Sequence, residues 1–366
     1  MSSIKIITIN VLVASALLGF LFLAPPTTHF VYSTLMGGSL NGSTDQRGGL
    51  ALYQKFPWAA KHFEEIGELT TQYYDFITWR RDDYIGDTIT VVNGLRKTEV
   101  HGNISNQIGT YWFFGGSTTW GTGVSDSYTY PSLFSAHQNA NVINYGESGY
   151  IARQSLAYLM NNIITNEQEN LTDVHVIFYD GVNDTSHYCR RAVNGLGTVR
   201  QAQLQNLIYR DLGKYSFKRT FSQLLDFFSS VVGKFDGAIT EIQYSCANNK
   251  ERAIEVATSV VSTWKAASDL VEARGGKFTA ILQPVAFFGA ADLSYLGLNA
   301  ENDIALSQQF KEVYPRIIEI AGERDFNFID LTSAYDGCGD CYIDYNHVGP
   351  QAHQMLVKKL SIALNE

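Results

Sequence analysis

Residues 110–121 read Thr-Tyr-Trp-Phe-Phe-Gly-Gly-Ser-Thr-Thr-Trp-Gly. The aromatic run from Tyr111 to Phe114 predicts a buried strand. Gly115-Gly116 lets the backbone turn sharply after it, because glycine has no Cβ to clash. Ser117 then follows the carboxyl end of the strand, which is where open α/β sheets bind ligands. Ser117 is therefore a candidate nucleophile, although glycine and serine also dominate ordinary turns.

From residue 110 onward, predicted strands alternate with predicted helices. The strands are expected at 110–114, 141–145, 173–179, 278–285 and 326–331, and the helices at 150–165, 249–274, 303–322 and 350–364. The apolar runs of the strands are continuous, as expected for strands buried on both faces. The alternation predicts an α/β fold with a parallel sheet between two layers of helices. Residues 186–248 interrupt the pattern and are interpreted as an insertion.

Three further motifs follow predicted strands or precede a predicted helix. They are Asn144-Tyr-Gly-Glu-Ser-Gly149, Gly181-Val-Asn-Asp184 and Asp344-Tyr-Asn-His347. With Ser117, and in this order, they resemble the SGNH hydrolase superfamily, the GDSL-type esterases and lipases, over roughly residues 108–364. The family's Gly-Asp-Ser reads Gly115-Gly116-Ser117 here. The resemblance implies a flavodoxin-like three-layer α/β/α sandwich around a parallel five-stranded sheet, with residues 110–366 as the hydrolase domain.

The residue types suit nucleophilic catalysis. A serine hydroxyl needs an adjacent base, and histidine suits that role because it titrates near neutral pH. His347 is the only histidine in a matching motif, and Asp344 can reach its imidazole across one turn. Asp344 would fix the tautomer of His347, as in other catalytic triads. Asp340 is a weaker candidate for this role, and a loop aspartate beside a helix-capping histidine is the structural alternative.

Acyl transfer also needs donors for the oxyanion of the transition state. By resemblance these are the backbone N–H groups of Ser117 and Gly149 and the side-chain amide of Asn183. Ser148 is a competing serine, but its surroundings lack the Gly-x-Ser-x-Gly spacing of a nucleophile elbow. The sequence shows no cluster of metal ligands, so neither a metal nor another cofactor is expected.

The composition fits a globular domain with a sizeable core. Of 366 residues, 45% are hydrophobic and 17% are charged, and the formal net charge is −9. No basic block appears, so a nucleic-acid partner is not expected, because binding phosphates requires Lys or Arg.

The N-terminal segment 6–24 contains no charged residue, follows Lys5 and ends at Pro25-Pro26. Its length is near the roughly 20 residues that span a bilayer, and it exceeds the usual signal-peptide core of about 7–15 residues. Residues 1–26 are therefore interpreted as a membrane anchor, with a cleaved signal segment as the alternative. The catalytic domain would lie outside the cytoplasm, or be secreted after cleavage. Residues 27–50, rich in Gly, Ser and Thr, are interpreted as a linker.

Residues 51–109 are expected to form an extension packed on the catalytic domain. Helical spacing runs over 51–80, including Phe63, Tyr73 and Phe76, and Thr88–Val92 followed by Asn93-Gly94 predicts a hairpin. The Trp79-Arg80 and Gly94-Leu95-Arg96 sequences resemble the corresponding region of membrane-anchored bacterial members of the family. Arg80, Arg81 and Arg96 are expected at the solvated surface.

The four cysteines are Cys189, Cys246, Cys338 and Cys341. An even number in an extracytoplasmic domain predicts disulfides, and the expected pairs are Cys189–Cys246 and Cys338–Cys341. A zinc site or a redox Cys-x-x-Cys is the less favoured interpretation.

The sequence predicts a serine hydrolase that acts on an ester, with an O-acetyl or short-acyl group on a carbohydrate as the expected substrate. A carbohydrate O-acyltransferase with the same triad, a lipase or thioesterase, and a non-catalytic carbohydrate-binding protein are the alternatives. Aromatic residues near the predicted strand ends could stack on sugar rings or belong to the core: Trp120, Tyr150, Tyr188, Phe287 and Phe288.

Overall fold

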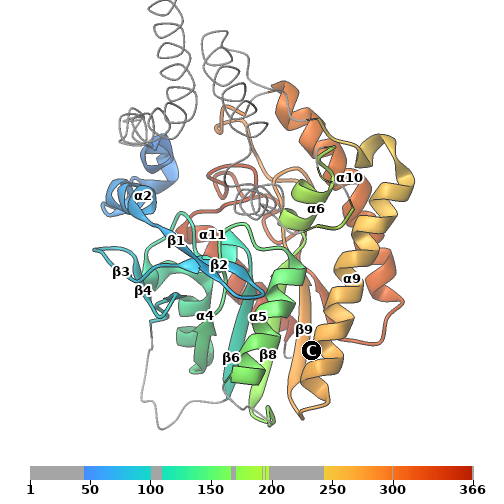
Figure 1. Cartoon of the computed structure of the whole chain (residues 1–366). Coiled ribbons are helices and arrows are strands. Elements are labelled where there is room, and N and C mark those ends of the chain that lie inside the picture. The colour runs from blue at the N-terminus through green and yellow to red at the C-terminus, as the bar shows by residue number, and fades with distance from the viewer. Residues whose placement is uncertain are drawn as a thin grey trace, which may run out of the picture. The chain divides into compact units, whose positions relative to one another are not determined.

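A parallel five-stranded sheet lies at the centre of the structure (Figure 1). The computed structural model describes residues 45–99, 109–165, 170–191, 193, 195–197, 243–298 and 300–364. The strands are β6 (Thr110–Gly115), β7 (Asn141–Asn144), β8 (Val174–Asp180), β9 (Lys277–Leu282) and β10 (Phe328–Asp330). Their order is β10-β9-β8-β6-β7, with every neighbouring pair parallel. This is the flavodoxin-like order, and it confirms the predicted fold class.

Side chains of each central strand alternate between two hydrophobic cores, one on each face of the sheet. On β8, Val176 and Phe178 belong to one core, and Ile177 and Tyr179 belong to the other. The first core includes buried residues of α5 (Ala152–Thr165), α9 (Lys250–Glu272) and α10 (Ala300–Gly322). The second includes those of α4 (Tyr130–Gln138) and α11 (Pro350–Ala363). The predicted three-layer sandwich is therefore present (Figure 1).

Residues 45–99 belong to the same compact unit as the sheet. Two 3₁₀ helices, η1 (Gln46–Gly49) and η2 (Ala51–Tyr53), precede α2 (Ala59–Glu68), so the expected linker ends earlier than residue 50. The chain then forms two antiparallel sheets, made of β1 (Thr71–Tyr74) with β2 (Thr78–Arg81) and of β3 (Tyr84–Ile85), β4 (Thr90–Val92) and β5 (Leu95–Arg96). The predicted hairpin at Asn93-Gly94 is confirmed, with φ of 53° and 70° at these residues.

Two predictions for this extension were wrong. Helical spacing was expected to continue to residue 80, but Tyr73 and Phe76 lie in the β1–β2 hairpin and are 68% and 88% exposed. These two aromatic side chains are therefore exposed on a hairpin and do not form part of an apolar helix face. Arg80 and Arg96 were expected at the surface but are buried. Arg96 forms an ion pair with Asp126 at 2.5 Å and its guanidinium lies over the Trp120 ring, so the buried charge has both a carboxylate and an aromatic partner.

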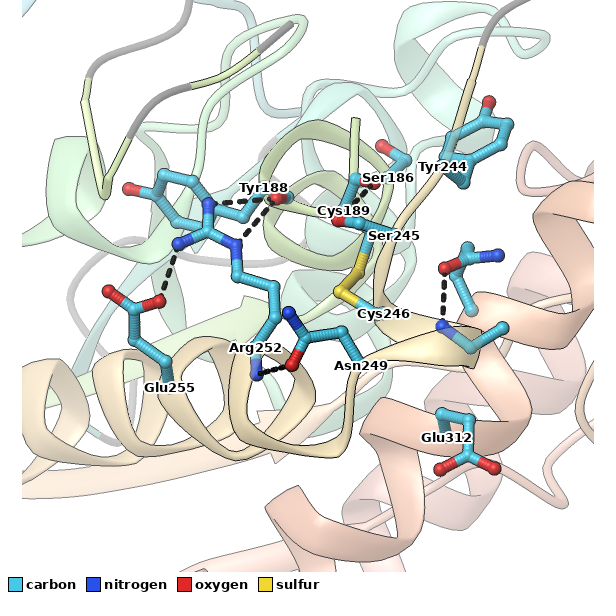
Figure 2. Close-up of a disulfide and its surroundings, with 12 residues drawn as sticks. Ser186, Tyr188, Cys189, Tyr244, Ser245, Cys246, Asn249, Arg252, Glu255 and Glu312 are labelled. Carbon is cyan, nitrogen blue, oxygen red and sulfur yellow. Dashed lines mark hydrogen bonds and ion pairs between the residues drawn. A yellow bond between two sulfur atoms is a disulfide. The ribbon is translucent and has the colours of Figure 1, made fainter. Parts of the chain in front are cut away.

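Both predicted disulfides are present, Cys189–Cys246 and Cys338–Cys341. The first joins the C-cap of α6 (Val182–Tyr188) to η5 (Cys246–Asn248), which leads into α9 (Figure 2). Arg252 on α9 donates to the carbonyl of Tyr188 beside it, at 2.9 Å from Nη2 (Figure 2). This disulfide therefore closes the ends of the insertion, most of which lies outside the described residues.

The predicted membrane segment 6–24 also lies outside the described residues. Across the part of the chain that the structure describes, no helix combines the length and hydropathy needed to cross a bilayer.

Candidate functional site

Ser117 lies at the carboxyl edge of the sheet, where the sequence predicted it. It begins the short helix α3 (Ser117–Trp120), immediately after β6 and Gly116. A Cβ at Gly116 would collide with the side-chain amide of Asn183, so glycine here leaves room for that amide in its present position. The strand end and this close approach therefore fix Ser117 beside the segment that carries Asn183.

His347 and Asp344 come to Ser117 from the other end of the chain. The Ser117 Oγ lies 2.7 Å from His347 Nε2, and His347 Nδ1 lies 2.7 Å from Asp344 Oδ2. The Asp344 Oδ1 accepts the backbone N–H groups of Asn346 at 3.0 Å and of His347 at 2.8 Å. These distances allow a proton to pass from serine to histidine, with aspartate orienting the imidazole. The structure therefore brings together the three predicted triad residues, and Asp340 is not needed for the arrangement.

The environment of Asp344 favours its ionised form. Burial raises the pKa of Asp344, but the charge of His347 and the hydrogen bonds from His347 and Asn346 outweigh burial and hold this pKa well below the usual range. Asp344 therefore carries a negative charge throughout the neutral range, as the orienting member of a triad requires.

The segments that carry the predicted oxyanion donors converge at Gly116. The Asn183 Nδ2 donates to the backbone carbonyl of Tyr150 at 2.7 Å, which uses one of its two hydrogens. A Cβ built on Gly116 would meet the amide of Asn183 and the Tyr150 carbonyl, so these segments converge beside Ser117. Gly149, which precedes Tyr150, has φ of +80°. The oxyanion role of Ser117, Gly149 and Asn183 stays a prediction that this arrangement supports.

A buried carboxylate fixes the helix that carries Asn183. Asp184 accepts the backbone N–H of Ala152, at the start of α5, at 3.1 and 3.2 Å from its two oxygens. Burial raises the pKa of Asp184, although the backbone hydrogen bonds oppose this effect. Asp184 therefore ties α6 to α5 next to Gly149 and Tyr150.

The extension contributes an ion pair to the loop that carries Gly149. Arg81 donates from its backbone N–H and from Nε to the two oxygens of Glu147, at 2.9 and 3.1 Å, and from Nη2 to Ser148 Oγ at 2.9 Å. Trp79 Nε1 donates to the Ser148 carbonyl at 3.3 Å, and the Tyr150 hydroxyl donates to the Trp79 carbonyl. Strand β2 therefore holds the loop that carries Gly149.

Sequence reasoning missed these contacts of β2. Arg81 was expected at the solvated surface, and Glu147 was quoted only as part of the Gly-Glu-Ser-Gly motif. The available signal was one acidic residue inside a glycine-rich motif, since an acidic side chain in a buried loop requires a partner.

Most of the aromatic residues considered for sugar stacking are core residues. Trp120, Tyr150 and Tyr188 are buried. Phe287 is half-buried and stacks on Tyr345 with ring centroids 5.9 Å apart. The competing interpretation, that these rings belong to the core, therefore holds for the three buried residues.

No group of three or more His, Cys, Asp or Glu side chains within the described residues has an arrangement that could hold a metal ion. All four cysteines are paired with one another in two disulfides, so none of them has a free thiol to bind zinc.

Replacing Asn183 with alanine tests the proposed oxyanion site. Turnover of an activated ester should fall about 10²- to 10³-fold, the scale for the loss of one oxyanion donor, and KM should change much less. The matched control is Asn170→Ala, because Asn170 is exposed before the opposite end of β8. An Asn183 variant that turns over substrate within a factor of two of the native protein would remove this residue from the site.

Sequence and structure comparisons give fold-level similarity alone. No protein-family model matches the chain, and no curated protein matches it in sequence. Among solved structures, the chain is similar to a lipolytic protein of the G-D-S-L family from Veillonella parvula, with 15% identity and a TM-score of 0.42 over 70% of this chain and 98% of that one. An acetylxylan esterase from Geobacillus stearothermophilus gives 13% identity and a TM-score of 0.39 over 71% and 95%. A carbohydrate acetylesterase family member from Sinorhizobium meliloti has 15% identity and a TM-score of 0.39, over 70% of this chain and 100% of that one.

Proposed function

We propose that this protein is a serine-dependent ester hydrolase of the SGNH type. The observation that carries the proposal is the continuous set of 2.7 Å contacts from Ser117 Oγ through His347 to Asp344. A loop aspartate beside a helix-capping histidine would not require a serine at the other imidazole nitrogen. A non-catalytic carbohydrate-binding protein would not need Ser117, His347 and Asp344 to be aligned at the carboxyl edge of the sheet.

The arrangement supplies each step of ester hydrolysis. Ser117 Oγ attacks the ester carbonyl while His347 Nε2 takes its proton, and Asp344 stabilises the resulting imidazolium. The N–H groups of Ser117 and Gly149 and the amide of Asn183 would stabilise the oxyanion of the tetrahedral intermediate. His347 then protonates the leaving alcohol, and a water molecule, activated by the same histidine, releases the acid from Ser117.

An O-acetyl or short-acyl ester of a carbohydrate outside the cytoplasm is the proposed substrate class. Two disulfides support an oxidising compartment, because disulfides persist outside the cytosol. The uncharged segment 6–24 supports an anchor that keeps the enzyme at a membrane surface, where exported polysaccharides emerge. Because Trp120, Tyr150 and Tyr188 are buried, these three of the five aromatic residues no longer support sugar binding.

Chain-length preference tests the substrate class. With the full chain and a series of p-nitrophenyl esters, kcat/KM should be highest for acetyl and fall toward octanoyl, and acetate should be released from acetylated sugars. Preference for octanoyl esters with no acetate release would overturn the carbohydrate proposal and favour a lipase or thioesterase. The Ser117→Ala protein is the background control. Adding a sugar acceptor and analysing the products separates hydrolysis from acyl transfer.

A further inference from the structure

We infer that Arg47, on η1 near the start of the described chain, is a positioning residue for the catalytic triad and acts through Asp344. Arg47 Nη1 lies 2.8 Å from Asp344 Oδ2, although 297 positions separate the two residues in sequence. The inference rests on the function proposed above and assigns part of the site to η1, within a segment that the sequence presented as a linker.

The hydrogen bonds of Asp344 show what Arg47 adds. An ionised carboxylate has about four lone-pair sites. Three are used within the Asp344–His347 loop, by the backbone N–H groups of Asn346 and His347 and by His347 Nδ1. Arg47 supplies the remaining donor, on the oxygen that also accepts from His347. Without Arg47, His347 Nδ1 is the one remaining donor to this oxygen among the described residues, and the carboxylate is held by one hydrogen bond fewer.

Arg47 is itself held in place. Its Nε donates to Asp45 Oδ1 at 3.0 Å, and its Nη2 donates to Asp45 Oδ2 at 2.7 Å. Nη1 is therefore left for Asp344. Its guanidinium carbon lies 5.0 Å from the centre of the Phe63 ring, which belongs to α2 and is buried. The planar fork of arginine is thus used on two carboxylates at once, which a lysine ammonium could not reproduce.

Arg47 has two effects on the triad. As a donor it restricts Asp344 and so keeps His347 aligned with Ser117, which should raise kcat. As a cation it opposes the positive charge that the imidazole gains on protonation. Losing Arg47 should therefore lower kcat on the plateau of the pH profile and also move the acid limb of kcat/KM to higher pH.

Burial raises the pKa of Asp184 on α6 to about 7, but Asp184 is the same in the native protein and in a variant at Arg47. The other titratable groups near this site keep a constant charge over the neutral range. Burial raises the pKa of the tyrosines and lowers the pKa of the histidines concerned, so these side chains stay neutral. Arg47 holds the pKa of Asp45 low despite burial in the native protein, and an aspartate without that partner is still ionised at neutral pH. Within the described residues these groups are Tyr53 on η2, His62 on α2, Tyr345 in the Asp344–His347 loop and His353 on α11. A shift of the acid limb can therefore be assigned to the loss of the Arg47 charge.

The test compares Arg47→Met with the native full chain. We expect kcat for p-nitrophenyl acetate to fall about three- to tenfold, since the ion pair is partly exposed and charge-assisted, with KM changed less than twofold. The acid limb should move up by about 0.5 pH unit at low salt and by less at high salt. The rate at which a fluorophosphonate labels Ser117 should fall in parallel. Arg47→Lys keeps the positive charge, so its acid limb should lie nearer to that of the native protein than the limb of Arg47→Met does. Its kcat should recover less, because lysine lacks the planar fork of arginine.

Two comparisons show whether Arg47 acts through Asp344. In the Asp344→Asn background, Arg47→Met should cause no further loss, because coupled residues are non-additive. Lys61→Met, which removes an exposed cation on α2, should leave kcat and the pH profile unchanged. An Arg47→Met protein with native kcat and an unmoved acid limb would overturn the inference, as would an equal loss in the Asp344→Asn background. If the native protein neither hydrolyses esters nor reacts with the fluorophosphonate, the proposed function has failed instead.

Discussion

Ser117→Ala is expected to lower ester turnover by about 10⁴-fold or more. The substitution removes the attacking oxygen and leaves His347 without its partner, while the oxyanion donors and substrate binding support a small residual rate. The change is from one small side chain to another at a buried position, so the fold should remain intact. The measurement is kcat/KM for p-nitrophenyl acetate, together with thermal unfolding to confirm that the variant is folded.

Covalent labelling separates the nucleophile from the competing serine. A fluorophosphonate should label the native protein and Ser148→Ala at Ser117, and it should not label Ser117→Ala. Ser148 is hydrogen-bonded to Arg81, and no triad contact of Ser148 occurs among the described residues. Near-native turnover by Ser117→Ala, or labelling that persists in it, would show that another residue is the nucleophile.

His347→Ala should cost as much as Ser117→Ala, because the members of a triad act as a unit. Ser117 would keep its hydroxyl but lose the base 2.7 Å away, so the nucleophile would no longer be activated. Since the effects do not add, the double variant Ser117→Ala/His347→Ala should be no slower than either single variant. Steady-state rates at pH 7, with the same acetyl ester, give this comparison.

A histidine outside the site provides the matched control. His137 lies in the last turn of α4, its Nδ1 lies 3.2 Å from Ser361 Oγ, and it has no part in the triad. His137→Ala should keep native turnover. A His347→Ala protein that retains more than about a tenth of native activity would contradict its role as the base.

The sequence determined the sheet and the chain positions of the triad because both depend on local patterns. Continuous apolar runs such as Tyr111–Phe114 identify strands buried on both faces, and their alternation with helices allows few topologies. Parallel strands place their carboxyl ends at one edge, which agrees with the resemblance that assigned Ser117 and Asn183 to one site. The motif Asp344–His347 supplied the proposed base and the proposed orienting carboxylate, which are three residues apart.

Only the tertiary structure decided what surrounds the triad. Arg47, Arg81 and Arg96 look alike in the sequence, yet their side chains pair with Asp344, Glu147 and Asp126. An arginine's burial depends on whether a carboxylate distant in sequence folds against it, and no local spacing records that partner. The same holds for Tyr73 and Phe76, whose helical spacing was overridden by a hairpin packed on the rest of the domain. Local pattern therefore determined the sheet and the positions of the proposed triad residues, whereas long-range packing of residues 45–99 determined how those residues are held.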